Sequence, residues 1–311
     1  MRLLLVGCSG FVGRELVPHL LAKGHQLTVL SRRDRPFPQC GSDNLQCLRF
    51  DPSQPSTWQQ PPVLKALEEA DGVVNLAGEP IAEKRWSPAQ LRRLEDSRLE
   101  TTRGLVKAMA ALAEPPAVLV NASAVGYYGT SLEQRFDETS PAGSDVLSRL
   151  CRDWEAAAEA APDPCRVVIV RIGIVLGPDG GALGRMLPVF KAGFGGPIGS
   201  GRQWMSWIHR LDLCRLIAAA LEESSYRGPY NAVAPEPTRM VDFAAALGRT
   251  LGRPSLLPVP APVLQLLLGD GASVVLEGQQ VLPSRLDREG FDFRYPDLSA
   301  ALAAATSPER R

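Results

Sequence analysis

The chain begins MRLLLVGCSGFVGR (residues 1–14), and this stretch decides the fold. The mostly apolar run from Arg2 to Val6 is long enough for one buried parallel strand. It leads directly into glycines at positions 7, 10 and 13 and then into a helical pattern. Glycine tolerates a sharp turn and leaves no side chain between backbone and ligand, and a helix N-terminus presents unpaired N–H groups to an anion.

The G-x-x-G-x-x-G spacing of these glycines is a variant of the dinucleotide-binding fingerprint. The alternative is a glycine-rich turn that binds nothing, but the strand before it and the helix after it favour a ligand. We therefore expect a dinucleotide to contact Gly7, Ser9, Gly10, Phe11, Val12 and Gly13.

The end of the second predicted strand indicates which dinucleotide binds. Residues 26–30 form that strand, and Ser31-Arg32-Arg33 follow it. A site for NAD usually has an acid here, and Asp34 comes a little late to serve. A hydroxyl and two guanidiniums suit the 2′-phosphate of NADP(H), because arginine donates paired, charge-assisted hydrogen bonds. Two solvated surface arginines are the alternative.

Composition and charge exclude several classes of function. Lys+Arg and Asp+Glu both number 34 among 311 residues, so the charge gives no argument for nucleic acid or an anionic membrane. No apolar run approaches the roughly twenty residues of a membrane span. Six scattered cysteines and three histidines indicate neither a metal site nor a disulfide framework. We expect a small-molecule substrate, a monomer or homodimer, and a cytoplasmic location, since a strand that starts at Met1 leaves no room for a signal peptide.

Strands and helices alternate along the first half of the chain. Further strands are predicted at residues 45–50, 72–76, 117–121 and 166–170, and this order makes a doubly wound parallel sheet of the Rossmann type. We predict an NADP-binding domain at residues 1–178, to which residues 205–234 return. Residues 179–204 and 235–311 are predicted to form a smaller, mainly helical substrate domain.

Short polar or small residues follow several of these strands, where a cofactor passes close to the backbone in a sheet of this type. Asp51 follows the third strand and either binds the adenine amino group or caps a turn; the residues favour neither. The other residues expected to contact the cofactor are Leu76, Ala77, Gly78, Glu79, Arg98, Ala122, Ser123, Arg171 and Gly173.

Two segments are candidates for the substrate site. Lys84 and Trp86 lie in a polar loop after the fourth strand, and Trp204, Trp207 and His209 lie together in a later loop. An arginine, two tryptophans and a histidine in one loop suit a ligand wall, with core aromatics around a hinge as the alternative. Asp212 is expected just behind them, capping the next helix.

Four stretches resemble one known family: GCSGFVG at 7–13, NLAGEPI at 75–81, SAVGYYG at 123–129 and WMSWIH at 204–209. They are similar to the extended branch of the short-chain dehydrogenase/reductase superfamily, and more narrowly to its atypical "epimerase family protein" subgroup. The segments VPAP at 259, GQQVLP at 278 and GFDF at 290 resemble the C-terminal part of that subgroup. The resemblance implies an NADP-binding Rossmann domain and a smaller C-terminal domain that closes over a substrate cleft.

The chain departs from the superfamily at the residues that transfer the proton. Active members carry a Tyr-x-x-x-Lys pair on the helix after the fifth strand. Counted back from Glu155, which resembles the family's glutamate on that helix, the two positions hold Leu147 and Cys151. Leucine has no proton to give, and a thiol cannot replace an ammonium that lowers a phenol pKa. The serine of the family falls at Ser123 or at the neighbouring Ala124.

Two functions remain open at this point. The first is an NADP(H)-dependent oxidoreductase or epimerase, acting on an unknown small carbonyl, hydroxyl or nucleotide-sugar-like compound, whose acid/base comes from Tyr127, Tyr128, Ser123 or His209. The second is a protein that binds NADP(H) without turnover, as a redox sensor or an interaction module. The fold alone does not decide between them.

Overall fold

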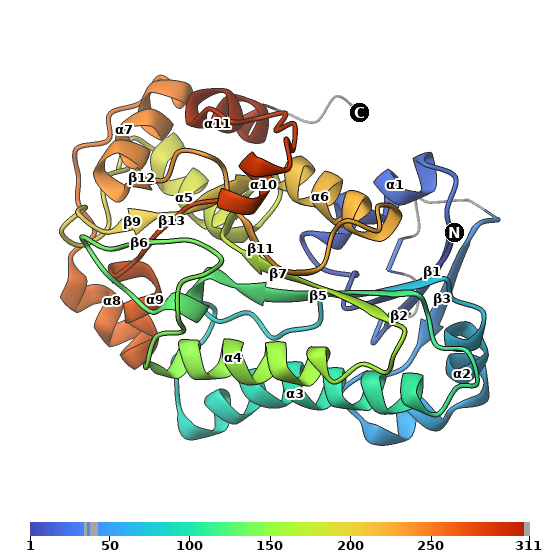
Figure 1. Cartoon of the computed structure of the whole chain (residues 1–311). Helices are drawn as coiled ribbons and strands as arrows, with labels where there is room; N and C mark the ends of the chain where they lie inside the picture. Colours follow the sequence, from blue (N-terminus) through green and yellow to red (C-terminus); the bar gives the residue numbers. More distant parts are fainter. Residues whose placement is uncertain (34–35, 38–42, 308–311) are drawn as a thin grey trace.

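The computed structural model describes residues 1–33, 36–37 and 43–307. Its centre is a seven-stranded sheet in the order β11-β7-β5-β4-β1-β2-β3, in which every neighbouring pair is parallel. The predicted doubly wound Rossmann-type sheet is confirmed (Figure 1). Its strands are β1 (Arg2–Val6), β2 (Gln26–Ser31), β3 (Leu45–Arg49), β4 (Gly72–Asn75), β5 (Val118–Ala124), β7 (Arg166–Ile172) and β11 (Gly228–Ala232).

The strand order reverses between β1 and β4. From β1 the chain builds outward through β2 and β3, and it then returns to place β4 on the other side of β1. The loops after β1 and β4 therefore leave the sheet side by side at its carboxyl edge. In open α/β sheets this switch point is where ligands bind.

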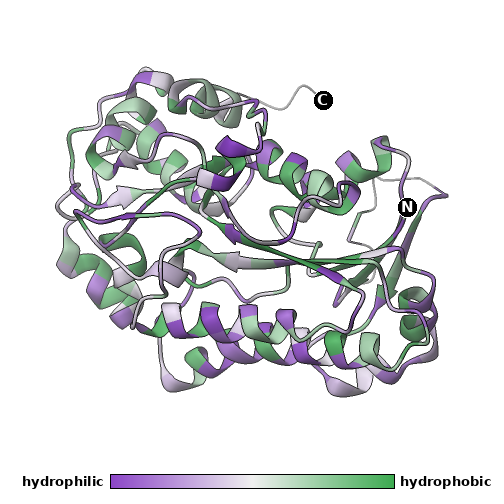
Figure 2. Cartoon of the chain, in the orientation of Figure 1, coloured by the Kyte–Doolittle hydropathy of each residue, from purple (hydrophilic) through white to green (hydrophobic). Residues whose placement is uncertain are grey.

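Helices cover both faces of the sheet (Figure 1). The first face carries α1 (Gly13–Ala22) and α6 (Arg210–Glu222), and the second carries α2 (Pro61–Glu68), α3 (Pro88–Ala110) and α4 (Val146–Glu159). Successive residues of β1 alternate between the two cores: Leu3 and Leu5 pack under α1 and α6, whereas Leu4 and Val6 pack under α2 and α3. Because both faces are covered, the central strands are mostly apolar (Figure 2), and polar side chains such as Asn75, Ser123 and Arg171 lie toward their carboxyl ends.

The long helix α3 begins with a side-chain cap. The Ser87 hydroxyl accepts a hydrogen bond from the Gln90 amide, and Pro88 occupies the first turn. Asp145 caps α4 in the same way by accepting from the Ser148 amide. Two side-chain caps thus fix where α3 and α4 begin, and both helices run along the same face of the sheet.

Most of the remaining elements lie beyond the carboxyl edge of the sheet, whereas α10 (Ser284–Arg288) packs against β11. A third core joins α5, α7 and α11 around Trp207 and Phe243. The C-terminal region is mainly helical, as predicted, and α6 and β11 return to the large sheet; the exact division into domains stays a prediction. These elements are β8 (Ile174–Leu176), α5 (Gly181–Lys191), β9 (Trp204–Met205), β10 (Trp207–His209), β12 (Thr238–Arg239), α7 (Met240–Leu251), α8 (Ala261–Leu268), α9 (Ser273–Leu276), α10 (Ser284–Arg288) and α11 (Leu298–Thr306).

Short elements complete the chain. The strands β6 (Arg135–Phe136) and β13 (Gln280–Val281) pair in parallel, which attaches the C-terminal segment beside the loop that follows β5. Three 3₁₀ turns lie at η1 (Pro55–Gln59), η2 (Val125–Tyr128) and η3 (Gly269–Ala272).

Asp212 does not cap α6, and its predicted role is corrected. The cap is His209, whose Nδ1 accepts a hydrogen bond from the Leu211 amide. The Asp212 carboxylate is fully buried and accepts hydrogen bonds from the amides of Arg294 (2.7 Å) and Tyr295 (2.9 Å). It therefore attaches the segment before α11 to the sheet domain.

Two helical glycines give a matched test of this packing. A Cβ at Gly104 of α3 would lie 2.4 Å from the Trp58 indole, whereas a Cβ at Gly184 of α5 would meet nothing closer than 4.0 Å. We expect Gly104→Ala to lower the free energy of unfolding by about 1–3 kcal/mol through overpacking. Gly184→Ala should raise it by about 0.5–1 kcal/mol, because alanine favours a helix over glycine. Urea denaturation measures both, and equal effects of the two changes would contradict the described contact.

Candidate cofactor and substrate site

The three glycines of the first loop serve different purposes. Gly7 has φ +73°, and a Cβ there would lie 2.4 Å from the backbone of Ala77 in the loop after β4. A Cβ at Gly13 would lie 1.6 Å from the Cys8 carbonyl oxygen. At Gly10 the nearest atom would be 3.9 Å away. Gly7 and Gly13 are therefore required by packing, and Gly10 leaves the surface of the loop open to a ligand.

The helix that follows this loop offers an anion site. Its N-cap residue, Val12, makes no side-chain hydrogen bond to the first turn of α1. The helix starts at the carboxyl edge of the sheet, so the positive end of its dipole lies on the side where a ligand binds and favours an anion there. Ser9, Phe11 and Val12 are partly exposed around this helix end, so the loop is accessible from solvent.

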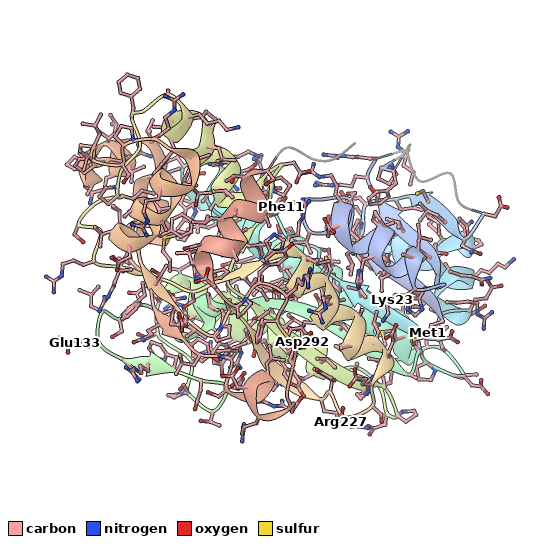
Figure 3. All side chains as sticks on the ribbon, turned by 90° about the horizontal axis from the view of Figure 1, so that it is seen from above. Met1, Phe11, Lys23, Glu133, Arg227 and Asp292 are labelled. Carbon is pink, nitrogen blue, oxygen red and sulfur yellow. The ribbon has the colours of Figure 1, made fainter. Side chains whose placement is uncertain are left out.

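Phe11 joins the loop to a later part of the chain. Cβ atoms at Gly177, Gly180 and Gly181 would each lie within 2.9 Å of its ring, and the Arg210 guanidinium lies 4.8 Å from the ring centroid. Figure 3 shows Phe11 at the boundary between the blue N-terminal elements and the later elements. The three glycines let the chain after β8 pass directly over the first loop.

The end of β2 has the features that the sequence predicted for a phosphate. The Ser31 hydroxyl is buried and accepts a hydrogen bond from the Arg33 amide at 3.0 Å, while Arg32 and Arg33 are exposed. The Lys84 ammonium, by its hydrogen bond, and more weakly the Arg32 charge lower the pKa of Glu79. Arg32 therefore lies within electrostatic reach of the loop after β4. Asp34 lies outside the described residues.

Asp51 has a local role after β3. Its carboxylate accepts hydrogen bonds from both the amide and the hydroxyl of Ser53, at 3.1 and 2.8 Å. These contacts agree with the alternative in which Asp51 caps a turn. A contact between Asp51 and the adenine amino group stays a prediction.

The loop after β4 is held by buried amides. Asn75 donates to Thr102 and to Asn121, at 2.9 and 2.7 Å, and accepts from the Ala77 amide. The Glu79 amide donates to the Ser97 hydroxyl, and the Arg98 guanidinium donates to the Glu79 carbonyl. The backbone from Leu76 to Glu79 is thus fixed beside Gly7 at the switch point.

A buried ion pair lies under the ends of β5 and β7. Arg171 donates to Glu155 twice, at 2.9 and 2.8 Å, and to the Tyr128 hydroxyl at 2.9 Å. Ser123 donates to the same Glu155 carboxylate, and Tyr128 donates to Asn231. These side chains are all at least nine-tenths buried. Ser123, Arg171 and Asn231 lie at paired positions on the neighbouring strands β5, β7 and β11. This pairing explains why residues so distant in sequence meet.

This network occupies several predicted site residues. Burial raises the pKa of Tyr128 to about 12, and both hydrogen-bonding roles of its hydroxyl are filled. Tyr128 is therefore a structural residue, and the prediction of a catalytic role is corrected. The Tyr127 ring stacks 3.6 Å from the Arg171 guanidinium. The side chains of Arg171 and Ser123 bind Glu155. If either residue contacts the cofactor, it does so through its backbone atoms.

Trp207 and His209 do not form a ligand wall. Trp207 is fully buried in the core around α7, and its indole N–H donates to the Glu236 carbonyl. His209 caps α6, stacks on Tyr295 at a centroid distance of 4.0 Å and is 9% exposed. The core-aromatic alternative thus holds for Trp207, and the expectation that both line the pocket is corrected.

A cavity of about 410 Å³ opens at the ends of β5 and β7. It lies between α3, α4, the loop after β5 and the C-terminal elements η3 and α9. Leu147 and Cys151, the positions of the family's tyrosine and lysine, both line it, one helical turn apart. A Cβ at Gly126 would lie 3.5 Å from Leu147 and 3.9 Å from the Cys151 sulfur, so the loop after β5 covers both side chains.

Of the predicted site residues, Trp86, Trp204, Arg98 and Gly173 line this cavity. Lys84 is exposed and pairs with Glu79 at 3.0 Å. The family resemblance implied that the C-terminal part covers the cleft, but the sequence did not indicate which of its residues line the cavity, because nothing local shows that β13 pairs with β6. The missed residues are Asp270, Ser273, Val274, Glu277 and Gln279.

The parallel sheet, the glycine loop at its switch point and the cavity at the same carboxyl edge, at the ends of β5 and β7, define a dinucleotide-binding protein of the short-chain dehydrogenase/reductase type. The sequence pattern described as "NAD dependent epimerase/dehydratase family" matches residues 3–232, and "Domain of unknown function (DUF1731)" matches residues 259–305. The chain belongs to the NAD-dependent epimerase/dehydratase family.

Three relatives show how far the likeness extends. The chain is 44% identical over 310 residues to an Arabidopsis thaliana protein named "Epimerase family protein SDR39U1 homolog, chloroplastic", covering 98% of this chain and 86% of that one. It is 40% identical over 306 residues to "Epimerase family protein SDR39U1" of Homo sapiens, covering 97% and 98%. The crystal structure of human SDR39U1 (isoform 2) with NADPH matches with a TM-score of 0.87 at 38% identity, covering 98% and 99%.

The location of the protein in the cell stays a prediction. Within residues 1–33, 36–37 and 43–307, no helix has the length and apolarity that crossing a membrane requires. The Arabidopsis relative is named as chloroplastic, so its family is not confined to the cytoplasm.

His209 gives a pH-dependent test of this arrangement. Burial, and then the Arg210 charge, lower the pKa of His209 to about 4, against an unfolded value of about 6.5. The neutral ring therefore stabilises the fold above pH 6.5, and this contribution is lost as the pH falls toward 4. At about 1.4 kcal/mol per pKa unit, the loss is roughly 3 kcal/mol.

His209→Asn should keep an N-cap acceptor without titrating in this range. Between pH 6.5 and 4, its free energy of unfolding should fall by about 3 kcal/mol less than that of the parent protein. Urea denaturation at several pH values measures the difference. If the free energy of unfolding changed equally with pH in the parent protein and in His209→Asn, His209 would be exposed to solvent and not buried.

Proposed function

We propose that the protein is an NADP(H)-dependent oxidoreductase, or an epimerase using the same chemistry, that acts on a small carbonyl or hydroxyl compound. Its proton donor differs from the Tyr-x-x-x-Lys pair of active members of the superfamily. The single observation that carries this proposal is the cavity of about 410 Å³ at the carboxyl ends of β5 and β7, with Leu147 and Cys151 in its wall. Its volume lies in the range of small-molecule sites.

Several residues support NADP(H) as the cofactor. Gly10 leaves the first loop open, and the N-terminus of α1 suits a pyrophosphate. Arg32 and Arg33 are exposed at the end of β2, where a 2′-phosphate would accept their hydrogen bonds. The human relative, which matches along nearly the whole chain, was crystallised with NADPH.

The reaction needs a proton as well as a hydride. NADPH, when bound, would supply the hydride and be released as NADP⁺. In the reduction of a carbonyl compound, the carbon takes this hydride and the oxygen takes a proton, which gives an alcohol. A proton donor typically contributes about 10²–10⁴ in rate, so the cavity needs a group that can give one.

Cys151 is the best-placed proton donor in the cavity wall. Burial, and then the Glu155 charge, raise the pKa of its thiol to about 11, so it carries a proton at neutral pH. Cys151 lies on α4 one helical turn before Glu155, whose carboxylate accepts the proton of the Ser123 hydroxyl. An alkoxide is a far stronger base than a thiolate of this pKa, so the transfer from Cys151 is downhill. Solvent then restores the proton.

We expect Cys151→Ala to lower the single-turnover rate of NADPH oxidation by about 10²–10⁴. The experiment mixes protein and NADPH with a panel of aldehydes and ketones and follows NADPH absorbance. Tyr127→Phe tests the competing candidate from the sequence: its side chain is not in the wall of the cavity, so removal of its hydroxyl should leave the rate unchanged if Cys151 is the donor. Equal rates for Cys151→Ala and the parent would assign the proton to another group.

The alternative function is NADP(H) binding without turnover. Leu147 and Cys151 favour it, because the pair that moves protons in the superfamily is missing. Tight NADPH binding together with no oxidation by any compound of the panel would establish this alternative in place of the enzyme.

A further inference from the structure

The wall of the cavity is mostly apolar. The aliphatic side chains come from α3, α4, β7 and the loop before α3, elements that are far apart in sequence. Six of them are Ile81, Leu91, Val146, Leu147, Leu150 and Ile172. Leu147 stands where the family has a tyrosine hydroxyl, so this departure also removes a polar group from the wall.

Three tryptophans add flat apolar surface to the same wall. Their indole N–H groups all bind the protein itself: Trp86 donates to the Ile81 carbonyl, Trp154 to Thr102 and Trp204 to the Leu132 carbonyl, at 2.8, 2.9 and 3.0 Å. None of these three N–H groups is left to bind a polar ligand. The tryptophans therefore offer their rings alone, which favours aromatic or alicyclic ligands.

The charged residues of the wall oppose a phosphate. Three carboxylates line the cavity among the described residues: Asp145, Asp270 and Glu277. The one arginine there, Arg98, donates to the carbonyls of Leu94 and Glu79 and lies 5.2 Å from the ring centroid of Trp154. A diphosphate needs unpaired arginine or lysine side chains, and acids facing it repel it.

Building on the proposed function, we propose that the substrate is an uncharged, mainly apolar carbonyl compound or the matching alcohol, with an aromatic or alicyclic ring, and not a nucleoside diphosphate sugar. The ring packs against the tryptophans and Leu147. The carbonyl oxygen faces Cys151, and the carboxylates at the wall exclude anions.

The test is a pair of calorimetric titrations of the full-length protein saturated with NADP⁺. The first ligand is 1-tetralone, an uncharged bicyclic ketone, and the second is UDP-glucose. We expect 1-tetralone to bind at least tenfold more tightly than UDP-glucose. Tighter binding of UDP-glucose, or no binding of 1-tetralone, would overturn the inference.

Matched variants locate the binding. Leu147→Asn on α4 and Val274→Asn on α9 each place an amide in the wall and should weaken 1-tetralone binding by about tenfold or more, because an apolar contact is replaced by a polar group. Leu256→Asn is the control, since Leu256 is 82% exposed and lies outside this cavity. Equal affinities in all three variants would also overturn the inference.

A separate measurement distinguishes the two proposals. NADPH oxidation by 1-tetralone is followed in the same protein by absorbance. Binding of 1-tetralone without oxidation would refute the oxidoreductase function and leave the ligand class intact. Oxidation of NADPH by UDP-linked keto-sugars, with no binding of 1-tetralone, would do the reverse.

Discussion

The buried ion pair between Glu155 and Arg171 organises the carboxyl edge of the sheet. Removing two charges from water is costly, and the pair is stable because each guanidinium nitrogen of Arg171 and both carboxylate oxygens of Glu155 have a hydrogen-bond partner. Arg171 donates twice to Glu155 and once to Tyr128, and Glu155 also accepts from Ser123. Removal of one partner from such a pair typically costs about 3–5 kcal/mol. The pair fixes α4 against the ends of β5 and β7, and thereby sets where Leu147 and Cys151 face the cavity.

Local parts of this account could be predicted from the sequence. A strand, three spaced glycines and a helix lie within twenty residues, so their geometry depends mainly on local rules, and the loop around Gly7 follows the prediction. Ser87 and Asp145 cap their helices for the same reason. The arginines after β2 stay exposed, as a phosphate site requires.

The features of the site that the sequence did not predict depend on contacts between segments far apart in the chain. Tyr128 follows a strand and looks available, but Arg171 and Asn231 from two other strands bind its hydroxyl. The loop that contains Trp207 has the aromatic side chains expected of a ligand wall. Trp207 itself, however, packs in a core that α7 and α11 complete. The C-terminal wall of the cavity arises from a pairing of β13 with β6 across more than a hundred residues. Sequence pattern alone specifies none of these contacts.

The central claim is that the switch point between β1 and β4 binds a dinucleotide through its 2′-phosphate. The most direct measurement is calorimetric titration of the protein with NADPH and with NADH, repeated on Arg32→Ala. A charge-assisted hydrogen bond contributes roughly 1.5–3 kcal/mol. The account therefore predicts that NADPH binds about 10- to 1,000-fold more tightly than NADH, and that Arg32→Ala removes most of this difference. Equal affinities of the unmodified protein for NADPH and NADH would contradict it.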